Sequence, residues 1–295
     1  MAVNRPLSFY PAFLILALSL QLVGCSHKND ESEDPLLKAY RLIDLHRTDE
    51  AIALMEDKLT GQPENDDYRE TLASAYAHKA GIRIQSLAPA VVESKKVEMI
   101  EKYASELDQT IKTSDGLSMG SQVYRILLGA SETIKNIVQV YSAVPTVSDE
   151  QSLLLRHAIS LLDGLHKPSS SALLYRSVLR FVFLKYQFGQ RFIGEIASSK
   201  LESICKVDLT DVTASINDCY TTLSSALNDL SGADPTLKES AMHANDRFRD
   251  LISDLTTKAT SLSLVDDAAM ATLGQSFLRM GLGKSVTCQA QGSGG

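Results

Sequence analysis

The sequence predicts an all-α protein, with helical hairpins near the N-terminus followed by an antiparallel helical bundle. Three observations carry this prediction. Glycine and proline are sparse, at 16 and 8 of 295 residues. Apolar residues recur at steps of three and four over long stretches, which is the spacing of one helix face. Few stretches alternate between apolar and polar residues, as a half-buried strand would.

The first expected element is a signal peptide over residues 1–24. Arg5 is its only charged side chain, and an apolar run from Phe13 to Leu22 follows it. The run closes on Leu22-Val23-Gly24-Cys25, which places small residues before a cleavage point, in the order of a secretory signal. This pattern closely resembles the lipobox of bacterial lipoproteins. The resemblance implies cleavage before Cys25 and lipid on its sulfur and its freed amine, and two or more acyl chains anchor a protein stably.

An uncleaved membrane anchor is the alternative for this segment, because residues 6–24 approach the roughly 20 residues that span a bilayer. Pro6, Pro11 and Gln21 interrupt that stretch, however, and its apolar core has the length of a signal-peptide core. In lipoproteins of bacteria with two membranes, Asp after the cysteine tends to retain the protein in the inner membrane. Ser26 stands there in this chain. We therefore expect attachment to the cell outer membrane, with the folded body in the periplasm.

Two segments are expected to lack stable structure. Residues 25–35 are polar and acidic, so burial cannot offset the entropy of ordering them and they predict a flexible tether. Residues 283–295 are rich in Gly, Ser and Gln at their end, and they predict a disordered, linker-like tail.

Residues 36–89 predict paired helices that repeat with a period of 34 residues. We expect two short helices around a turn near His46, between residues 37 and 59, and a third over 66–79. The period aligns the following pairs: Ala39 with Ala73, and Leu42 with Tyr76.

A small residue, a large apolar residue and a closing proline follow at Ala51, Met55 and Pro63. The stretch from residue 38 to residue 81 thus resembles one full tetratricopeptide repeat plus the first helix of the next, and an ordinary helical hairpin is the alternative. In the same register, Gln85 and Pro89 take the places of Ala51 and Met55. The repeat is therefore not expected to continue.

Residues 90–282 predict the antiparallel helical bundle, because their apolar stripes have 3-4 spacing and short loops separate them. We expect helices over these stretches: 91–112, 123–144, 149–167, 173–192, 209–230 and 234–262. Ser148 and Gln151 predict a capping box at the start of the third helix. Asp234 and Pro235 predict the start of the last, with Asp as N-cap and Pro at N1.

The expected helix over 173–192 is apolar on several faces, yet it carries four basic side chains: Arg176, Arg180, Lys185 and Arg191. It is too charged to span a membrane. We expect a central helix whose basic groups reach outward to solvent. The alternative is a partly exposed apolar and basic face that binds a partner or lipid headgroups.

Cysteine usage suggests a disulfide. With Cys25 consumed by lipid, Cys205, Cys219 and Cys288 would share an oxidising compartment. A Cys205–Cys219 bridge requires a bend near residues 206–208 to bring the two Cα atoms together. A Cys219–Cys288 bridge, or a buried Cys219 with no bridge, are the alternatives.

No pattern for a catalytic, metal or cofactor site is found, and we expect neither an enzyme nor a cofactor. His157 and His166 share one segment with Asp163, but their nine-residue spacing places the two histidines on nearly opposite sides of a helix. Without the signal peptide, 28 basic and 36 acidic side chains leave a net charge near −8. That charge argues against nucleic acid as a partner.

The expected function is a membrane-anchored helical scaffold or adaptor for a protein partner, which would bind a shallow groove beside Tyr40, Tyr68 and Tyr76. This function rests on analogy with groove-forming repeats. The alternative is a lipoprotein that binds a small molecule or lipid, such as an accessory component of a solute transporter. Its pocket would be lined by Tyr175, Phe181, Phe183 and Phe188.

Overall fold

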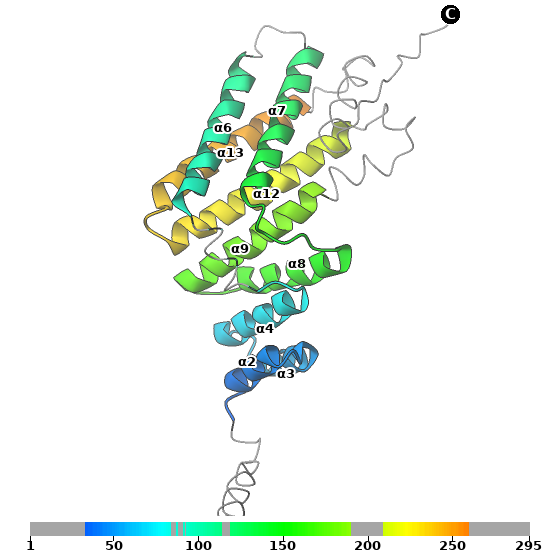
Figure 1. Ribbon diagram of the computed structural model, residues 1–295, viewed down its shortest axis with the longest axis vertical. Coiled ribbons are helices and arrows are strands. Elements are labelled where there is room, and N and C mark those ends of the chain that lie inside the picture. The colour runs from blue at the N-terminus through cyan, green and yellow to red at the C-terminus, as the bar shows by residue number, and fades with distance from the viewer. Residues whose placement is uncertain are drawn as a thin grey trace, which may run out of the picture.

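The computed structural model describes residues 33–83, 87, 91, 93–113, 119–189 and 209–259. These residues form α-helices and no strand, which confirms the all-α class (Figure 1). The expected signal peptide and tail, together with Cys25, Cys205 and Cys288, lie outside the described residues.

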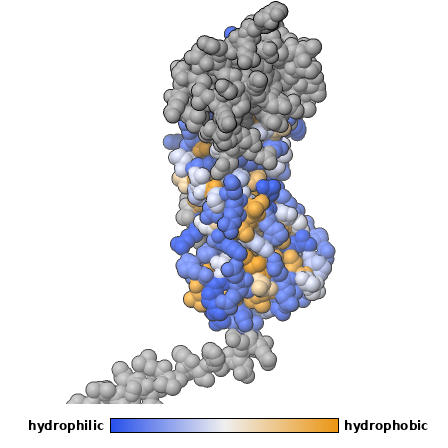
Figure 2. Space-filling view, turned by 90° about the vertical axis from the view of Figure 1, so that its right-hand side faces the viewer, coloured by the Kyte–Doolittle hydropathy of each residue, from blue (hydrophilic) through white to orange (hydrophobic). Residues whose placement is uncertain are grey.

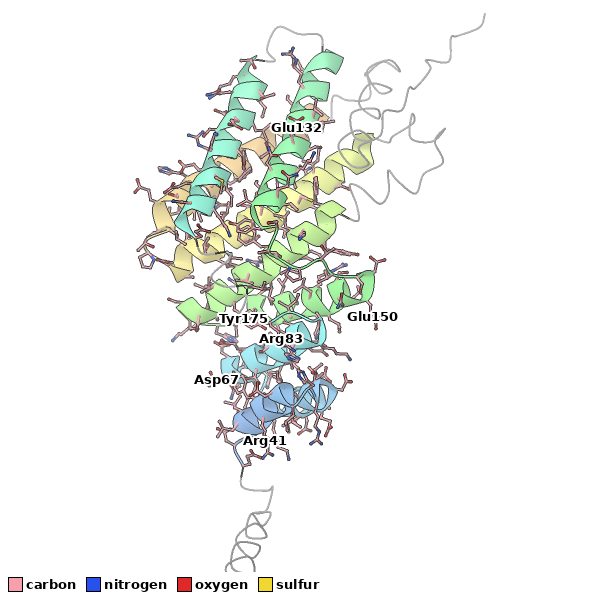
Figure 3. The ribbon with its side chains drawn as sticks, in the orientation of Figure 1. Arg41, Asp67, Arg83, Glu132, Glu150 and Tyr175 are labelled. Carbon is pink, nitrogen blue, oxygen red and sulfur yellow. The ribbon has the colours of Figure 1, made fainter. Side chains whose placement is uncertain are left out.

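The described helices are α2 (Pro35–Asp44), α3 (Thr48–Gly61), α4 (Asp66–Lys79), α6 (Ser94–Thr113), α7 (Met119–Val140), α8 (Asp149–Asp163), α9 (Ser170–Gln187), α12 (Leu209–Ala233) and α13 (Lys238–Ala259). Each packs against the next in the spatial order α2, α3, α4, α8, α9, α12, α13, α6, α7. The result is an elongated stack with α2 and α3 at one end and the α6–α7 hairpin at the other (Figure 1). Arg41 of α2 and Glu132 of α7 lie far apart along it (Figure 3).

The predicted turn between the first two helices is present, at residues 45–47. His46 adopts a left-handed conformation with φ of 59°, and the N–H of Arg47 donates to the carbonyl of Leu42 at 2.8 Å. This is the bonding of a Schellman motif, which satisfies carbonyls at a helix end. The α2 helix begins at Pro35, the last residue of the expected tether.

Small residues make the contacts between the first three helices. Ala39, Ala51 and Ala73 are fully buried, as is Met55, so the positions chosen by the 34-residue period are core positions. Buried small residues let helix backbones approach closely, and large ones fill the groove between them.

Gln85 and Pro89, on which the expected end of the repeat rests, lie outside the described residues, and the structure describes what surrounds α4. Gly81, with φ of 82°, follows the helix. The outer side of α4 packs against α8, which comes much later in the chain. Ala73, Ala77 and Ala80 belong to the same apolar core as the helices beyond residue 90, so that core continues across the expected division at 89/90.

Helix starts in the bundle follow local signals closely. The capping box is confirmed: Ser148 N–H donates to Gln151 Oε1 at 2.9 Å, and Gln151 N–H donates to Ser148 Oγ at 3.3 Å. The prediction for α13 was less accurate, because that helix begins at Lys238. Asp234 instead caps a preceding turn, where its carboxylate accepts the N–H of Thr236 at 2.8 Å.

Candidate functional site

Helix α9 lies at the centre of the molecule, packed against α8 and α12, which confirms the expected central helix. Half of its side chains are buried, including Ala172, Tyr175, Ser177, Val178, Leu179, Phe181, Val182 and Leu184. The apolar and basic character of this segment therefore reflects its position in the core. It does not give a broad exposed docking face.

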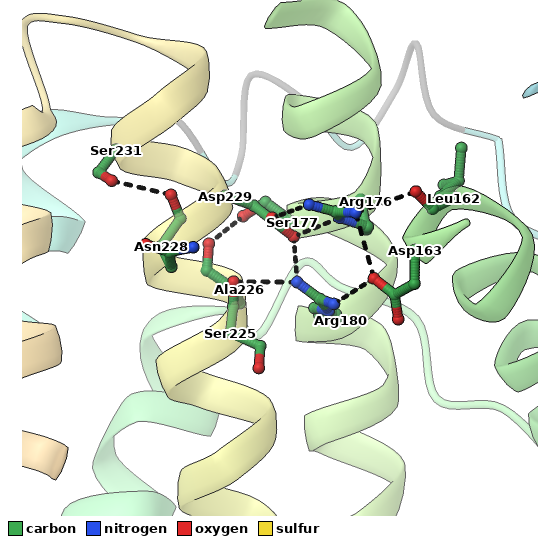
Figure 4. A network of polar contacts seen from close by, with 10 residues as sticks. All are labelled: Leu162, Asp163, Arg176, Ser177, Arg180, Ser225, Ala226, Asn228, Asp229 and Ser231. Atoms are coloured by element: carbon green, nitrogen blue, oxygen red, sulfur yellow. Dashed lines mark hydrogen bonds and ion pairs between the residues drawn. The ribbon is translucent and has the colours of Figure 1, made fainter. Parts of the chain in front are cut away.

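The basic side chains of α9 do not reach solvent as expected. Arg176 and Arg180 are only 14% and 13% exposed, and both bind Asp229 of α12, which is 1% exposed (Figure 4). Arg176 donates from Nε at 3.0 Å and from Nη2 at 2.5 Å, and Arg180 donates from Nη1. Arg180 Nη2 also binds Asp163 of α8 at 2.5 Å. Because Asp229 neutralises their charge inside the protein, these arginines are stable without extending to solvent.

Backbone carbonyls complete this network. Arg176 donates to the carbonyl of Leu162 at 2.9 Å, and Arg180 donates to that of Ser225 at 3.1 Å. Burial acts to lower the pKa of Arg176, but the hydrogen bonds and charge of Asp229 outweigh it and the pKa is raised. Burial also raises the pKa of Asp229, which the two guanidiniums oppose. The network joins α8, α9 and α12, and its two guanidiniums are balanced by two carboxylates.

The four aromatic residues of the expected pocket pack against different elements. Tyr175 reaches α4, where its hydroxyl donates to the carbonyl of Ala73 at 3.4 Å. Phe181 contacts Tyr141 with ring centroids 4.4 Å apart. Phe183 lies 5.5 Å from the guanidinium of Arg156 on α8, and Phe188 is buried in the core. Tyr175, Phe181 and Phe188 are thus buried in the core, and Phe183 is partly buried against it.

The three tyrosines of the expected partner surface also separate. Tyr40 is 46% exposed, and its hydroxyl accepts a hydrogen bond from Thr71 at 3.3 Å. Tyr68 is half-buried against the N-terminal core. Tyr76 donates to Glu56 at 2.6 Å, and burial together with this bond and the charge of Glu56 raises the pKa of Tyr76 to about 12.

Thr71 and Tyr76 are five residues apart on α4, which places them about 140° apart around the helix axis. The ring of Tyr76 packs edge-on against His157 of α8, with centroids 4.4 Å apart. Tyr40 therefore contacts a different side of α4 from the side that carries Tyr76, and the hydroxyls of Tyr40 and Tyr76 do not meet.

A polar joint that the sequence did not suggest connects α4 to the loop after α8. The carboxylate of Asp66 accepts the N–H groups of His166 and Lys167, each at 3.1 Å, and the His166 ring also contacts Glu64. The hydrogen bond from the His166 N–H, and then that from the Lys167 N–H, lower the pKa of Asp66. The two sides are 100 residues apart in sequence, so no local pattern pairs them.

Cys219 is buried in α12, and since Cys205 and Cys288 are not described, the disulfide stays a prediction. Among the described residues, no three or more metal-ligating side chains cluster together. None of the described helices is both long enough and apolar enough to cross a membrane.

Large apolar side chains are exposed at six of the described positions: Leu37, Tyr40, Leu45, Met99, Leu153 and Met242. Figure 2 shows that hydrophobic residues on one side of the molecule lie in a band with hydrophilic residues on both sides. Contiguous exposed apolar surface is a feature of interaction sites in proteins generally. Comparison with protein-family models, with curated proteins and with solved structures finds no match to this chain.

Proposed function

We propose that the protein is a lipoprotein of the bacterial cell envelope, anchored by lipid on Cys25 in the outer membrane, and that its helical body is a periplasmic scaffold or adaptor for a protein partner. The observation that carries the proposal is Leu22-Val23-Gly24-Cys25 at the end of an apolar run. The first described helix begins ten residues after Cys25, which suits a body held close to a membrane.

The interior of the body supports a role in binding over one in catalysis. Its most buried charges, Arg176, Arg180 and Asp229, are used to join helices. The four core aromatics contact different elements, so they do not favour the alternative, in which a pocket beside α9 takes a small molecule or lipid. Exposed apolar side chains on an elongated helical surface suit a protein partner.

The anchor is tested by expressing Cys25→Ala in a bacterium with two membranes and labelling with palmitate. We expect loss of the label and of membrane association, because the acyl acceptor is gone. Cys288→Ala is the matched control and should keep both. A Cys25→Ala protein that is still labelled, or a wild-type chain whose mass shows no lipid, would contradict the proposal.

The adaptor role is tested by placing a photocrosslinking residue at Leu153, Met99 or Met242 in turn, in the lipidated chain in its host. These exposed positions lie on α8, α6 and α13. A partner surface predicts one protein captured from one position and lost when a neighbouring residue there is changed to Glu. The same set of proteins captured from every position would count against an adaptor.

A further inference from the structure

The outer face of α2, at the end of the helical stack, exposes three large apolar side chains. Leu37, Tyr40 and Leu45 are 63%, 46% and 58% exposed, and they are three of the six large apolar side chains exposed in the described residues. At 100° per residue, Tyr40 and Leu45 flank Leu37 within an arc of about 140°. The core residues Ala39, Leu42 and Ile43 lie on the opposite side. A terminal element of a stack normally carries a polar outer face.

The position of α2 in the chain says which surface is nearest. It lies at one end of the stack, farthest from α6 and α7 (Figure 1). Pro35 is ten residues after Cys25, and an extended chain spans at most about 3.6 Å per residue, so α2 begins within about 36 Å of the anchored residue. A tether this short keeps α2 close to the bilayer, so the effective concentration of membrane at α2 is high.

The charged side chains of α2 determine how deeply the helix can enter a bilayer. Arg41 is exposed on α2 and ion-paired with Glu33 at 2.8 Å, and Lys38 is half-buried. Tyrosine and the long basic side chains suit the headgroup layer, where the apolar stem is buried and the polar end stays hydrated. Arg41 and Asp44 lie in the same arc and oppose deeper insertion. Three apolar side chains are few for an interfacial helix, so binding of α2 to the membrane depends on the tether and its lipid anchor.

From these observations we infer that the outer face of α2 rests on the bilayer that holds the anchor, with Leu37, Tyr40 and Leu45 in the headgroup layer. The inference rests on the proposed function, because lipid on Cys25 supplies the membrane. It fixes which end of the stack faces the membrane and leaves α8, α13 and the α6–α7 hairpin available to a protein partner.

The absence of tryptophan makes a direct test possible, since a single introduced Trp is the only indole in the chain. Leu37→Trp is compared with Leu153→Trp, whose site on α8 is equally exposed at 61%. Both lipidated full-length chains are reconstituted in phosphatidylcholine vesicles with and without bromine on the acyl chains. We expect bromine to quench Leu37→Trp at least about twofold more than Leu153→Trp, with emission at shorter wavelength.

A second change tests the arc itself. Leu45→Glu in the Leu37→Trp chain should reduce the quenching to the level of Leu153→Trp, whereas Leu153→Glu in the same chain should leave it unchanged. Equal quenching at positions 37 and 153, in chains that float with the vesicles, overturns the inference and leaves the anchor intact. A chain without lipid overturns the proposed function and this inference with it. If a crosslinker at Leu37 captures a protein and indole quenching is absent, the face belongs to a protein partner and the inference fails.

Discussion

The α2–α4 layer and the α8–α9–α12 centre hold their helices together by different means. In the α2–α4 layer, fully buried alanines such as Ala39 and Ala51 let helices approach closely, and ion pairs stay at the surface. In the centre, large aromatic side chains fill the space between helices and the ion pairs are buried. Lys79 and Asp49 pair at 42% and 80% exposure, against 14% and 1% for Arg176 and Asp229.

This difference shows that the same chemical pair has different consequences in the two regions. An exposed ion pair is worth roughly 0–1 kcal/mol, because water and salt screen it. Removing one partner of a buried pair costs far more, because the other charge is left in the interior. Stability of the α2–α4 layer should therefore depend on shape, and stability of the centre on charge balance.

The largest expected effect is that of Asp229→Ala. The change leaves two buried guanidiniums without their shared carboxylate, and we expect the free energy of unfolding to fall by about 3–5 kcal/mol. Urea denaturation followed by circular dichroism measures it. Asp246→Ala is the control: Asp246 pairs with Arg249 at the surface, at 51% and 67% exposure, and its loss should cost under about 1 kcal/mol.

The same urea denaturation can distinguish the effect of an unbalanced charge from the effect of lost packing. Replacing Arg176 and Arg180 by Met together with Asp229→Leu removes the buried charges and keeps side-chain volume. Apolar replacements of buried ion pairs are often neutral or stabilising, so this triple variant should recover most of the loss. A triple variant as unstable as Asp229→Ala would show that shape, rather than charge, matters in the centre too, and the comparison would break down.

An intermediate effect is expected from Ala51→Leu in the α2–α4 layer. Ala51 is fully buried between helices, so three added carbons force them apart and should cost about 1–3 kcal/mol. Ala53→Leu, two residues along the same helix at an exposed position, is the matched control and should be within about 0.5 kcal/mol of wild type. Equal stability of the two variants would mean that the layer has room that its buried alanines do not suggest.

Local features of the sequence predicted the helices well. Caps such as Ser148 with Gln151, and apolar residues at 3-4 spacing, act over a few residues, so the chain near them reveals the structure. Asp234 predicted the start of α13 one turn too early, because it caps a turn that precedes that helix.

The contacts between distant helices were not predictable in the same way. Packing of α4 against α8 depends on surfaces far apart in sequence, and so does the pairing of Arg176 with Asp229, 53 residues away. One sequence feature did point to a buried acidic partner. Arg176 and Arg180 are four residues apart on an otherwise apolar helix, which places both charges on one face. The prediction that these two arginines extend to solvent was therefore wrong.

The smallest expected effect lies at the joint between the two regions, where Asp66 binds the loop after α8. Because these bonds lower the pKa of Asp66 in the folded state, they stabilise the protein above the unfolded pKa near 3.9, and this stability is lost as pH falls through the lower folded value. Asp66→Asn should therefore lower the free energy of unfolding by about 1 kcal/mol at pH 6, with the gap to wild type closing toward pH 3. Asp67→Asn, at the exposed neighbouring residue, should show little difference at either pH. If the Asp66→Asn gap were independent of pH, the Asp66 charge would not hold the joint, and the α2–α4 layer would be attached to the centre by apolar packing alone.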